Sequence, residues 1–233
     1  MEPILESYGL SKSYGGFMAL NNVNLTFNRG RIIGLLGPNG SGKTTWMKMV
    51  AGLIKPTMGT ITYKGMPIGV ETKRKIAYMS TEPFFYNFMT VHDVGKYYEE
   101  FFDDFDPIKY KELITRMGLN MTDKSKNLSS GLAAKLKIAA TLARKAEIYL
   151  LDEPLNGIDI IAREHIVNAM LEAATDNATL IISSHLVDEL EKIIDNAIFI
   201  KEGNLVLAGE AENIRAQHQK SIVDLYKEIY AYM

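Results

Sequence analysis

One glycine-rich stretch decides the fold class: residues 37–44 read GPNGSGKT. An apolar run of strand length, 31–36, comes directly before it, and the segment 43–53 that follows has its apolar residues at helical spacing. A buried strand, a glycine-rich turn and a helix therefore follow one another. The pattern GxxxxGK[ST] in this setting is typical of a loop that holds phosphate groups. The alternative is an ordinary glycine-rich turn with an exposed lysine.

The chemistry of this loop follows from its backbone. Glycines let the chain curl so that successive N–H groups face one anion, and the helix that starts there adds its positive end. Lys43 is placed to reach the β- and γ-phosphates of a nucleotide, and Thr44 offers a hydroxyl to Mg²⁺. The predicted phosphate-loop residues are Gly37, Pro38, Asn39, Gly40, Ser41, Gly42, Lys43, Thr44 and Thr45.

Composition limits the class of protein. The 233 residues suffice for one large domain or two small ones, and 47% apolar with 23% charged residues is ordinary soluble globular usage. The chain has no cysteine, which excludes disulfides, thiolate metal sites and a cysteine nucleophile. No apolar run approaches the roughly 18 residues of a spanning helix, and no secretory signal is visible, so we expect a cytoplasmic protein. A net charge of −2 gives no general attraction to nucleic acid.

The order of patterns along the chain predicts a layered α/β domain, because short β-rich runs alternate with helical ones. Residues 4–10 and 22–28 read as an antiparallel hairpin around Gly15 and Gly16. A compositionally distinct insert, 84–106, is rich in aromatic and acidic residues. Its aromatic residues at 97, 98, 101, 102 and 105 alternate with acidic residues at 99, 100, 103 and 104, which predicts one helix with an aromatic and an acidic face.

A second chemical motif ends an apolar strand. Residues 148–153 read IYLLDE, so two adjacent carboxylates, Asp152 and Glu153, follow a buried run. A carboxylate at the end of a strand beside a phosphate loop can hold Mg²⁺, and the next residue can orient or deprotonate an attacking water. Taken alone, such a pair is more often a solvated turn.

A third motif, LSSGL at 128–132, precedes a helix rich in Ala, Leu and Lys. Ser129 or Ser130 as N-cap explains it structurally. The exposed N–H groups of the same helix start would also hold a phosphate presented by another molecule.

These three motifs in this order resemble the nucleotide-binding domain of ABC-type ATPases over nearly the whole chain. The resemblance implies an α/β fold, with a P-loop NTPase core of ABC type, an antiparallel β subdomain and an α-helical subdomain. It implies one domain, 1–233. Its parts are a core at 1–83 and 146–209, a helical subdomain at 84–145 that includes the LSSGL helix, and a C-terminal helical tail at 210–233.

The resemblance also implies residue roles, with ATP and Mg²⁺ as ligands. Tyr14 resembles the aromatic residue that stacks on adenine, and Met18 its apolar companion. The catalytic positions are Lys43, Glu153 and His185, and the Mg²⁺ positions are Thr44 and Asp152. Ser129, Ser130 and Gly131 resemble the family's signature segment, and Asp159 belongs to its D-loop at 156–159. His185 would donate to the γ-phosphate. The family arrangement is a head-to-tail dimer with two ATPs between the phosphate loop of one subunit and the signature of the other.

The sequence departs from the family at three positions. Thr81 stands where a glutamine would contact both Mg²⁺ and the attacking water, and its short side chain cannot fill both roles. Glu82 could make these contacts in place of the glutamine, but it would add a negative charge beside the γ-phosphate. Ser130 and Leu132 replace a glycine and a glutamine of the signature. We therefore expect an active ATPase whose hydrolysis is slow or gated by a partner.

The leading functional hypothesis is the ATP-hydrolysing subunit of an ABC transporter, peripheral on the inner face of the membrane through a separately encoded multi-spanning permease. The second partner is another nucleotide-binding subunit, identical or different, and no nucleic acid is expected. The candidates for a permease groove beside the helical insert are Phe84, Phe85, Tyr86 and Phe88, with core packing as the alternative. A soluble mechanochemical ATPase acting on nucleic acid or a ribosome, and a kinase, are rival hypotheses. The solute stays open, and the short tail helix favours export only slightly.

Overall fold

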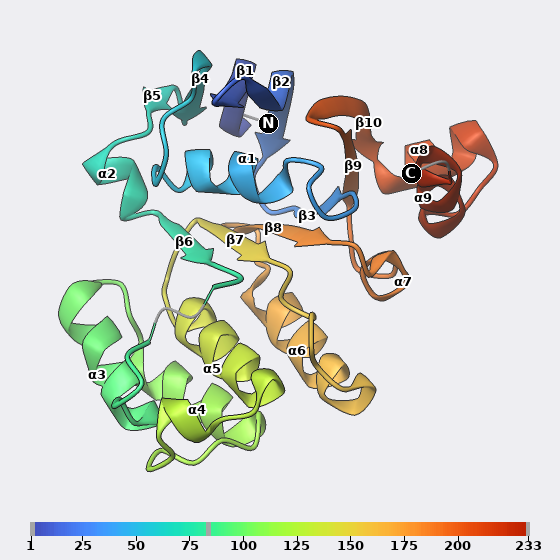
Figure 1. Ribbon diagram of the computed structural model, residues 1–233. Coiled ribbons are helices and arrows are strands. Elements are labelled where there is room, and N and C mark those ends of the chain that lie inside the picture. Colours follow the sequence, from blue (N-terminus) through green and yellow to red (C-terminus); the bar gives the residue numbers. More distant parts are fainter. Residues whose placement is uncertain (1–2, 83–84, 232–233) are drawn as a thin grey trace.

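Two β-sheets organise the computed structural model, which describes residues 3–82 and 85–231 (Figure 1). The smaller sheet is antiparallel and has the strand order β2-β1-β4-β5. Its strands are β1 (Pro3–Tyr14), β2 (Phe17–Asn28), β4 (Met58–Tyr63) and β5 (Met66–Pro67). The predicted hairpin is present with longer strands: Tyr14 pairs with Phe17, and Gly15 and Gly16 turn the chain at positive φ.

The larger sheet carries the strand order β10-β9-β3-β8-β7-β6. All its pairs are parallel except β9 with β10. Its strands are β3 (Ile32–Leu36), β6 (Ile76–Met79), β7 (Ile148–Asp152), β8 (Thr179–Ser184), β9 (Asn196–Lys201) and β10 (Asn204–Glu210). Parallel strands end at the same edge of a sheet, so the residues after β3, β7 and β8 meet there.

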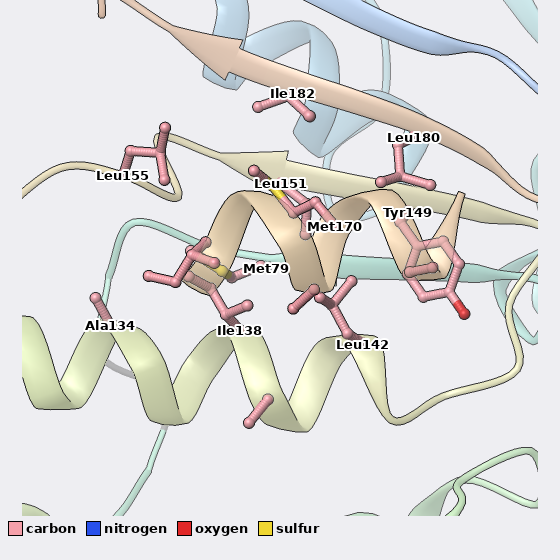
Figure 2. Close-up of a cluster of buried hydrophobic side chains, with 14 of the residues drawn as sticks. Met79, Ala134, Ile138, Leu142, Tyr149, Leu151, Leu155, Met170, Leu180 and Ile182 are labelled. Atoms are coloured by element: carbon pink, nitrogen blue, oxygen red, sulfur yellow. The ribbon is translucent and has the colours of Figure 1, made fainter. Parts of the chain in front are cut away.

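Helices cover the larger sheet on both faces (Figure 1). On one face lies α1 (Lys43–Val50), whose Trp46 and Met47 pack with Ile33 and Leu35 of β3. On the opposite face lie α5 (Ser130–Leu142) and α6 (Ile160–Ala173). Two hydrophobic cores result, one between the sheet and α1 and a second between the sheet and the pair α5 and α6. Figure 2 shows this second core, in which side chains of α5 and α6 pack under alternate residues of β6, β7 and β8. Continuous apolar strands, buried on both faces, are what a parallel sheet between two helical layers requires.

The insertion between β6 and β7 is helical. It contains α3 (Val91–Phe101), α4 (Pro107–Arg116), a short 3-10 helix η1 (Ser125–Asn127) and α5. Thr90 and Asp93 form a capping box at α3, and Asp106 caps α4. The predicted division of the chain into 1–83 with 146–209, 84–145 and 210–233 stays a prediction.

One predicted helix is wrong at its C-terminal end. The aromatic helix ends at Phe101, so Phe102 and Phe105 lie outside it, and the two-faced pattern stops there. Asp104 binds the guanidinium of Arg144 through its two oxygens, at 2.9 and 3.1 Å, and Phe105 is buried. These tertiary contacts turn the chain away from the helix axis, a turn that local spacing cannot predict.

The remaining helices are short: α2 (Val70–Lys73), α7 (Val187–Leu190), α8 (Ala211–His218) and α9 (Ile222–Tyr230). The last of them packs against β9, because the Tyr230 hydroxyl lies 2.9 Å from the Ile200 carbonyl oxygen and the Lys201 ammonium donates to Ile229. Within residues 3–82 and 85–231, no helix combines the length and the apolar character that a membrane crossing requires.

Candidate functional site

The loop between β3 and α1 is closely packed against its neighbours. Gly42 is the N-cap of α1 with φ 112°, and a Cβ atom there would lie 2.6 Å from the Ala19 carbonyl oxygen of β2. A Cβ at Gly37 would lie 2.5 Å from the Ile200 carbonyl oxygen of β9. Only glycine fits either position, so these residues fix the curl of the loop. Among the described residues, no side chain caps α1, which leaves its first N–H groups for an anion.

Lys43 lies inside this curl with its side chain 5% exposed. Its ammonium donates to the carbonyl oxygens of Gly37, at 2.6 Å, and Pro38, at 3.0 Å. Glu153 Oε1 lies 3.5 Å from the same nitrogen. Burial lowers the pKa of Lys43, and the charge of Glu153 opposes that shift. The loop therefore holds a positive charge where phosphates would bind.

Ser41 adds a buried polar atom to the loop. Its side chain is 2% exposed, and its hydroxyl has no hydrogen-bond partner in the part of the chain that the structure describes. An unpaired buried hydroxyl is costly unless a ligand satisfies it, so this atom fits a phosphate loop. Thr45, in the first turn of α1, is half-buried.

Asp152, the last residue of β7, is fully buried and gathers three hydroxyl groups. Oδ1 accepts from Ser183, at 2.6 Å, and from Thr44, at 3.1 Å. Oδ2 lies 3.4 Å from the hydroxyl of Tyr78. Burial, followed by the charge of Asp152, raises the pKa of Tyr78, so this hydroxyl stays protonated and can donate.

The donor set around Asp152 fits Mg²⁺. Thr44 and Asp152 offer hard oxygen atoms 3.1 Å apart at the start of α1. The described residues contain no cluster of three acidic or imidazole ligands that would hold a metal unaided. Mg²⁺ ordinarily uses one or two protein oxygens and completes its shell with phosphate oxygens and water, so the pair suffices.

Glu153 and His185 complete the group of polar side chains around Lys43 and Asp152. Glu153 adopts a left-handed backbone, φ 50°, and its N–H donates to the Ser183 hydroxyl at 3.0 Å. Its side chain is 9% exposed, and Oε2 lies 2.8 Å from His185 Nδ1. The carboxylate therefore lies between Lys43 and His185. A non-glycine residue with positive φ, held by contacts with β8 and α1, is a candidate functional position.

The structure thus brings together the predicted Lys43, Thr44, Asp152, Glu153 and His185. Sequence reasoning missed Tyr78 and Ser183, which connect to Asp152 from β6 and β8. A signal existed for Ser183, because two serines end the otherwise apolar strand 179–184. Nothing in the sequence near Tyr78 indicates which carboxylate it meets.

Tyr14 and Met18 lie at the tip of the β1–β2 hairpin. Tyr14 is 48% exposed, with the Lys12 ammonium 5.0 Å from its ring centre, and Met18 is 40% exposed. Met18 directly precedes Ala19, whose carbonyl oxygen is the atom that packs closely against Gly42. The hairpin tip therefore stands next to the phosphate loop and presents an exposed aromatic ring.

The signature segment is elsewhere in the chain. Ser129 caps α5 by accepting from Leu132 N–H at 3.3 Å, and Ser129 and Ser130 are exposed. A Cβ at Gly131 would lie 3.3 Å from the Gly157 carbonyl oxygen. In the described part of the chain, no hydrogen bond joins this segment to Lys43 or Glu153. α5 and α1 lie on opposite faces of the larger sheet (Figure 1), so the helix that follows the signature is separated from the helix that follows the phosphate loop.

The predicted D-loop residue Asp159 is the N-cap of α6. Its carboxylate accepts from Ala162 N–H at 2.9 Å. The side chain is thus engaged within its own helix, and its assignment to nucleotide binding stays a prediction.

A cavity of about 490 Å³ lies between α1 and α3. Its walls include Lys48, Leu53, Tyr78, Ser80, Glu82, Tyr97 and Phe102. Among the predicted groove residues, Phe84 lies outside the described residues and Phe85 packs against the second core. Tyr86 and Phe88 stack on each other, are exposed and do not line this cavity. The structure therefore places a cavity beside the helical insertion, but with other residues in its walls.

Comparisons with known proteins agree with this geometry. The model of a protein family described as ABC transporter matches residues 20–156. The chain belongs to the ABC transporter family. An uncharacterised ABC transporter ATP-binding protein of Bacillus subtilis, YcbN, is 33% identical over 95% of this chain and 74% of its own length. The lantibiotic transport ATP-binding protein SrtF of Streptococcus pyogenes is 32% identical over 94% of this chain and 98% of its own.

Solved structures show the same fold. An ATP-binding subunit of an ABC transporter superposes with a TM-score of 0.87 and 26% identity, covering 97% of this ABC protein and 98% of that chain. A dimeric ATP-binding cassette in a post-hydrolysis state with ADP and phosphate has a TM-score of 0.79 at 21% identity, over 88% and 98% of the two chains. The predicted resemblance, the α/β fold and the ATPase class are confirmed, and the chain is an ATP-binding ABC ATPase subunit.

Proposed function

We propose that this ABC ATPase binds and hydrolyses ATP to energise a separately encoded membrane permease, by ATP-driven closure of a dimer. The observation that supports this most is the placement of Glu153 between Lys43 and His185, beside the Thr44–Asp152 pair. A carboxylate 3.5 Å from the phosphate-binding lysine and 2.8 Å from a histidine is suited to accept a proton from a water that attacks the γ-phosphate.

Each residue then has one task in the reaction. The backbone N–H groups at the start of α1 and the Lys43 ammonium bind and orient the phosphates. Glu153 takes the proton of the attacking water, and His185 holds the Glu153 carboxylate through Oε2 and faces the γ-phosphate. Tyr14 provides the stacking surface for adenine. Thr44 and Asp152 would hold Mg²⁺, which when bound neutralises charge that develops on the phosphate oxygens.

The dimer follows from the separation of the signature from the phosphate loop. Ser129 and Ser130 are exposed on the helical insertion, and in the described part of the chain no hydrogen bond joins this segment to Lys43 or Glu153. A second nucleotide-binding subunit, turned head to tail, would bring this helix start to the γ-phosphate held by the first. Binding of ATP then joins the two surfaces, and hydrolysis separates them.

The permease would dock in the cavity between α1 and α3. Its walls combine exposed apolar side chains such as Leu53, 59% exposed, with the charged Lys48 and Glu82. A transport role is supported by the relative SrtF, which is named for lantibiotic transport. In this arrangement the chain lies on the cytoplasmic face of the membrane, held there by the permease.

Glu153→Gln tests the catalytic assignment. We expect this variant to bind ATP, to lose at least 100-fold in ATP turnover and to accumulate as a dimer in ATP, because the amide cannot accept the proton while the loop is intact. Phosphate release and light scattering after gel filtration measure the two effects. The exposed Glu164→Gln on α6 is the control and should behave as the wild type. Unchanged turnover in Glu153→Gln contradicts the assignment.

The transport role has a separate test. The tagged chain, expressed in its own organism and solubilised with mild detergent, should co-purify with a multi-spanning membrane protein that stimulates its ATPase activity. Stimulation by nucleic acid, with no membrane protein bound, would instead favour a soluble mechanochemical ATPase.

A further inference from the structure

The segment after β6 lacks a side chain that contacts the catalytic group. Thr81 is exposed, and the Glu82 side chain is 75% exposed and lies 3.5 Å from Lys48 of α1. Over residues 3–82 and 85–231, no hydrogen bond connects either side chain to Asp152 or Glu153. Any contact that links residues 80–82 to the site must therefore be made by their backbone and not by the side chains of Thr81 and Glu82.

A lysine from another element binds that backbone. Lys137 of α5 places its ammonium 2.9 Å from the Ser80 carbonyl oxygen and 2.8 Å from the Thr81 carbonyl oxygen. Lys137 is half-buried. Burial lowers its pKa, and the charge of Asp152 acts in the opposite direction. Hydrogen bonds from a charged donor are stronger than those between neutral groups, so two of them hold the segment firmly on the helix.

The position of Lys137 connects two surfaces. Ser80 and Glu82, on either side of Thr81, line the cavity between α1 and α3. Lys137 lies six residues after Gly131 on the same helix, about 9 Å along its axis at 1.5 Å per residue. An α-helix transmits displacement along its axis with little bending over this length. The Lys137 ammonium therefore connects the segment that lines the cavity to α5, the helix whose N-terminal end is exposed.

We propose that Lys137 is a positioning residue that fastens segment 80–82 to the signature helix, so that a partner which displaces the segment also moves the signature. The identity of that partner as the permease, and of the α5 N-terminus as a phosphate site, rests on the proposed function.

The first test needs neither nucleotide nor permease. Amide hydrogen exchange of the free chain is compared between wild type, Lys137→Met, which keeps the apolar stem, and Lys137→Arg, which keeps the charge. We expect exchange over residues 79–82 to speed up at least five-fold in Lys137→Met and to stay near wild type in Lys137→Arg. The strand 148–152 should not change in either. Equal exchange over 79–82 in all three proteins overturns the proposal.

The second test measures the effect on the signature. In the Glu153→Gln background, Lys137→Met should raise the ATP concentration for half-maximal dimer formation about ten-fold, while nucleotide affinity of the monomer stays within two-fold. Lys137→Arg should restore dimer formation, and the exposed Lys111→Met on α4 is the matched control. If Lys137→Met forms dimers at the same ATP concentration as the parent Glu153→Gln protein, Lys137 does not couple segment 80–82 to the signature. Failure of the parent itself to dimerise counts against the proposed function, and the exchange experiment then decides the role of Lys137.

Discussion

The N-termini of α1 and α5 are two helix starts of the same type with opposite surroundings. At α1 the N-cap is Gly42, enclosed by β2 and supplied with a lysine and two carboxylates from the same chain. At α5 the N-cap is Ser129, whose hydroxyl accepts from the Leu132 N–H of its own helix, and both Ser129 and Ser130 are exposed. Both starts offer N–H groups and a positive helix end to an anion.

The difference shows which part of the site one chain can complete. Lys43, Glu153 and His185 lie together beside the phosphate loop. In the described part of the chain, no ion pair joins these side chains to the start of α5, and under the proposed function this start receives a phosphate that another subunit presents. Substitutions at the two starts should therefore differ in what they affect. Those at α1 should weaken folding and nucleotide binding strongly, whereas those at α5 should leave nucleotide binding by the monomer intact.

Gly42→Ala should have the largest effect. The left-handed backbone costs an alanine about 1–2 kcal/mol, and overlap of its Cβ with the Ala19 carbonyl oxygen adds about 1–3 kcal/mol. We expect a lower free energy of unfolding in urea and at least ten-fold weaker ATP binding by calorimetry. Gly65→Ala is the matched control, because it has φ 75° with open space around its Cβ. If both variants lose the same free energy of unfolding, the close packing at Gly42 does not contribute to stability.

Gly131→Ala should have an intermediate effect, confined to the dimer. A Cβ there would lie 3.3 Å from the Gly157 carbonyl oxygen, a contact that a small shift relieves, and the backbone is not left-handed. We expect an unchanged melting temperature and unchanged ATP affinity of the monomer. In the Glu153→Gln background, dimer formation should require about ten-fold more ATP, since the methyl group occupies space at the signature. Loss of ATP binding by the monomer would contradict the separation of the two sites.

Ser129→Ala should have the smallest effect of the three, a modest loss of stability. It removes the acceptor of the Leu132 N–H, and loss of a serine N-cap costs about 1 kcal/mol. For a chain of this size that corresponds to a decrease of roughly 2–4 °C in melting temperature, measured by calorimetry. Ser129→Thr keeps a capping hydroxyl and should melt near the wild type. A melting temperature unchanged in the alanine variant would show that α5 does not depend on its cap.

Local motifs, together with the family resemblance, predicted which polar side chains meet at one edge of the sheet. Lys43 and Thr44 stand at the start of one helix, and Asp152, Glu153 and His185 follow the parallel strands β7 and β8. Because parallel strands end at one edge of the sheet, residues far apart in the sequence meet there without further information. The apolar runs and the glycine-rich turn therefore predicted the α/β class and the phosphate loop, and the family resemblance added His185.

Three polar partners could not be predicted in the same way. Tyr78 and Ser183 reach Asp152 from neighbouring strands, and Lys137 reaches the Ser80 and Thr81 carbonyls from α5. Each depends on strand order or on how a helix packs, which single-sequence patterns do not contain. The predicted C-terminal end of the aromatic helix was wrong for a related reason, since the Asp104–Arg144 ion pair helps turn the chain after Phe101.

The sequence by itself determined the phosphate loop, the carboxylate pair and the α/β class, because backbone curl, strand burial and helix starts are encoded within a few neighbouring residues. Only the tertiary structure decided that Glu153 lies between Lys43 and His185, that α5 and α1 lie on opposite faces of the sheet, and that Lys137 binds the segment after β6. Those arrangements arise from packing helices on two faces of one sheet, which sets distances between residues that the chain order leaves undefined.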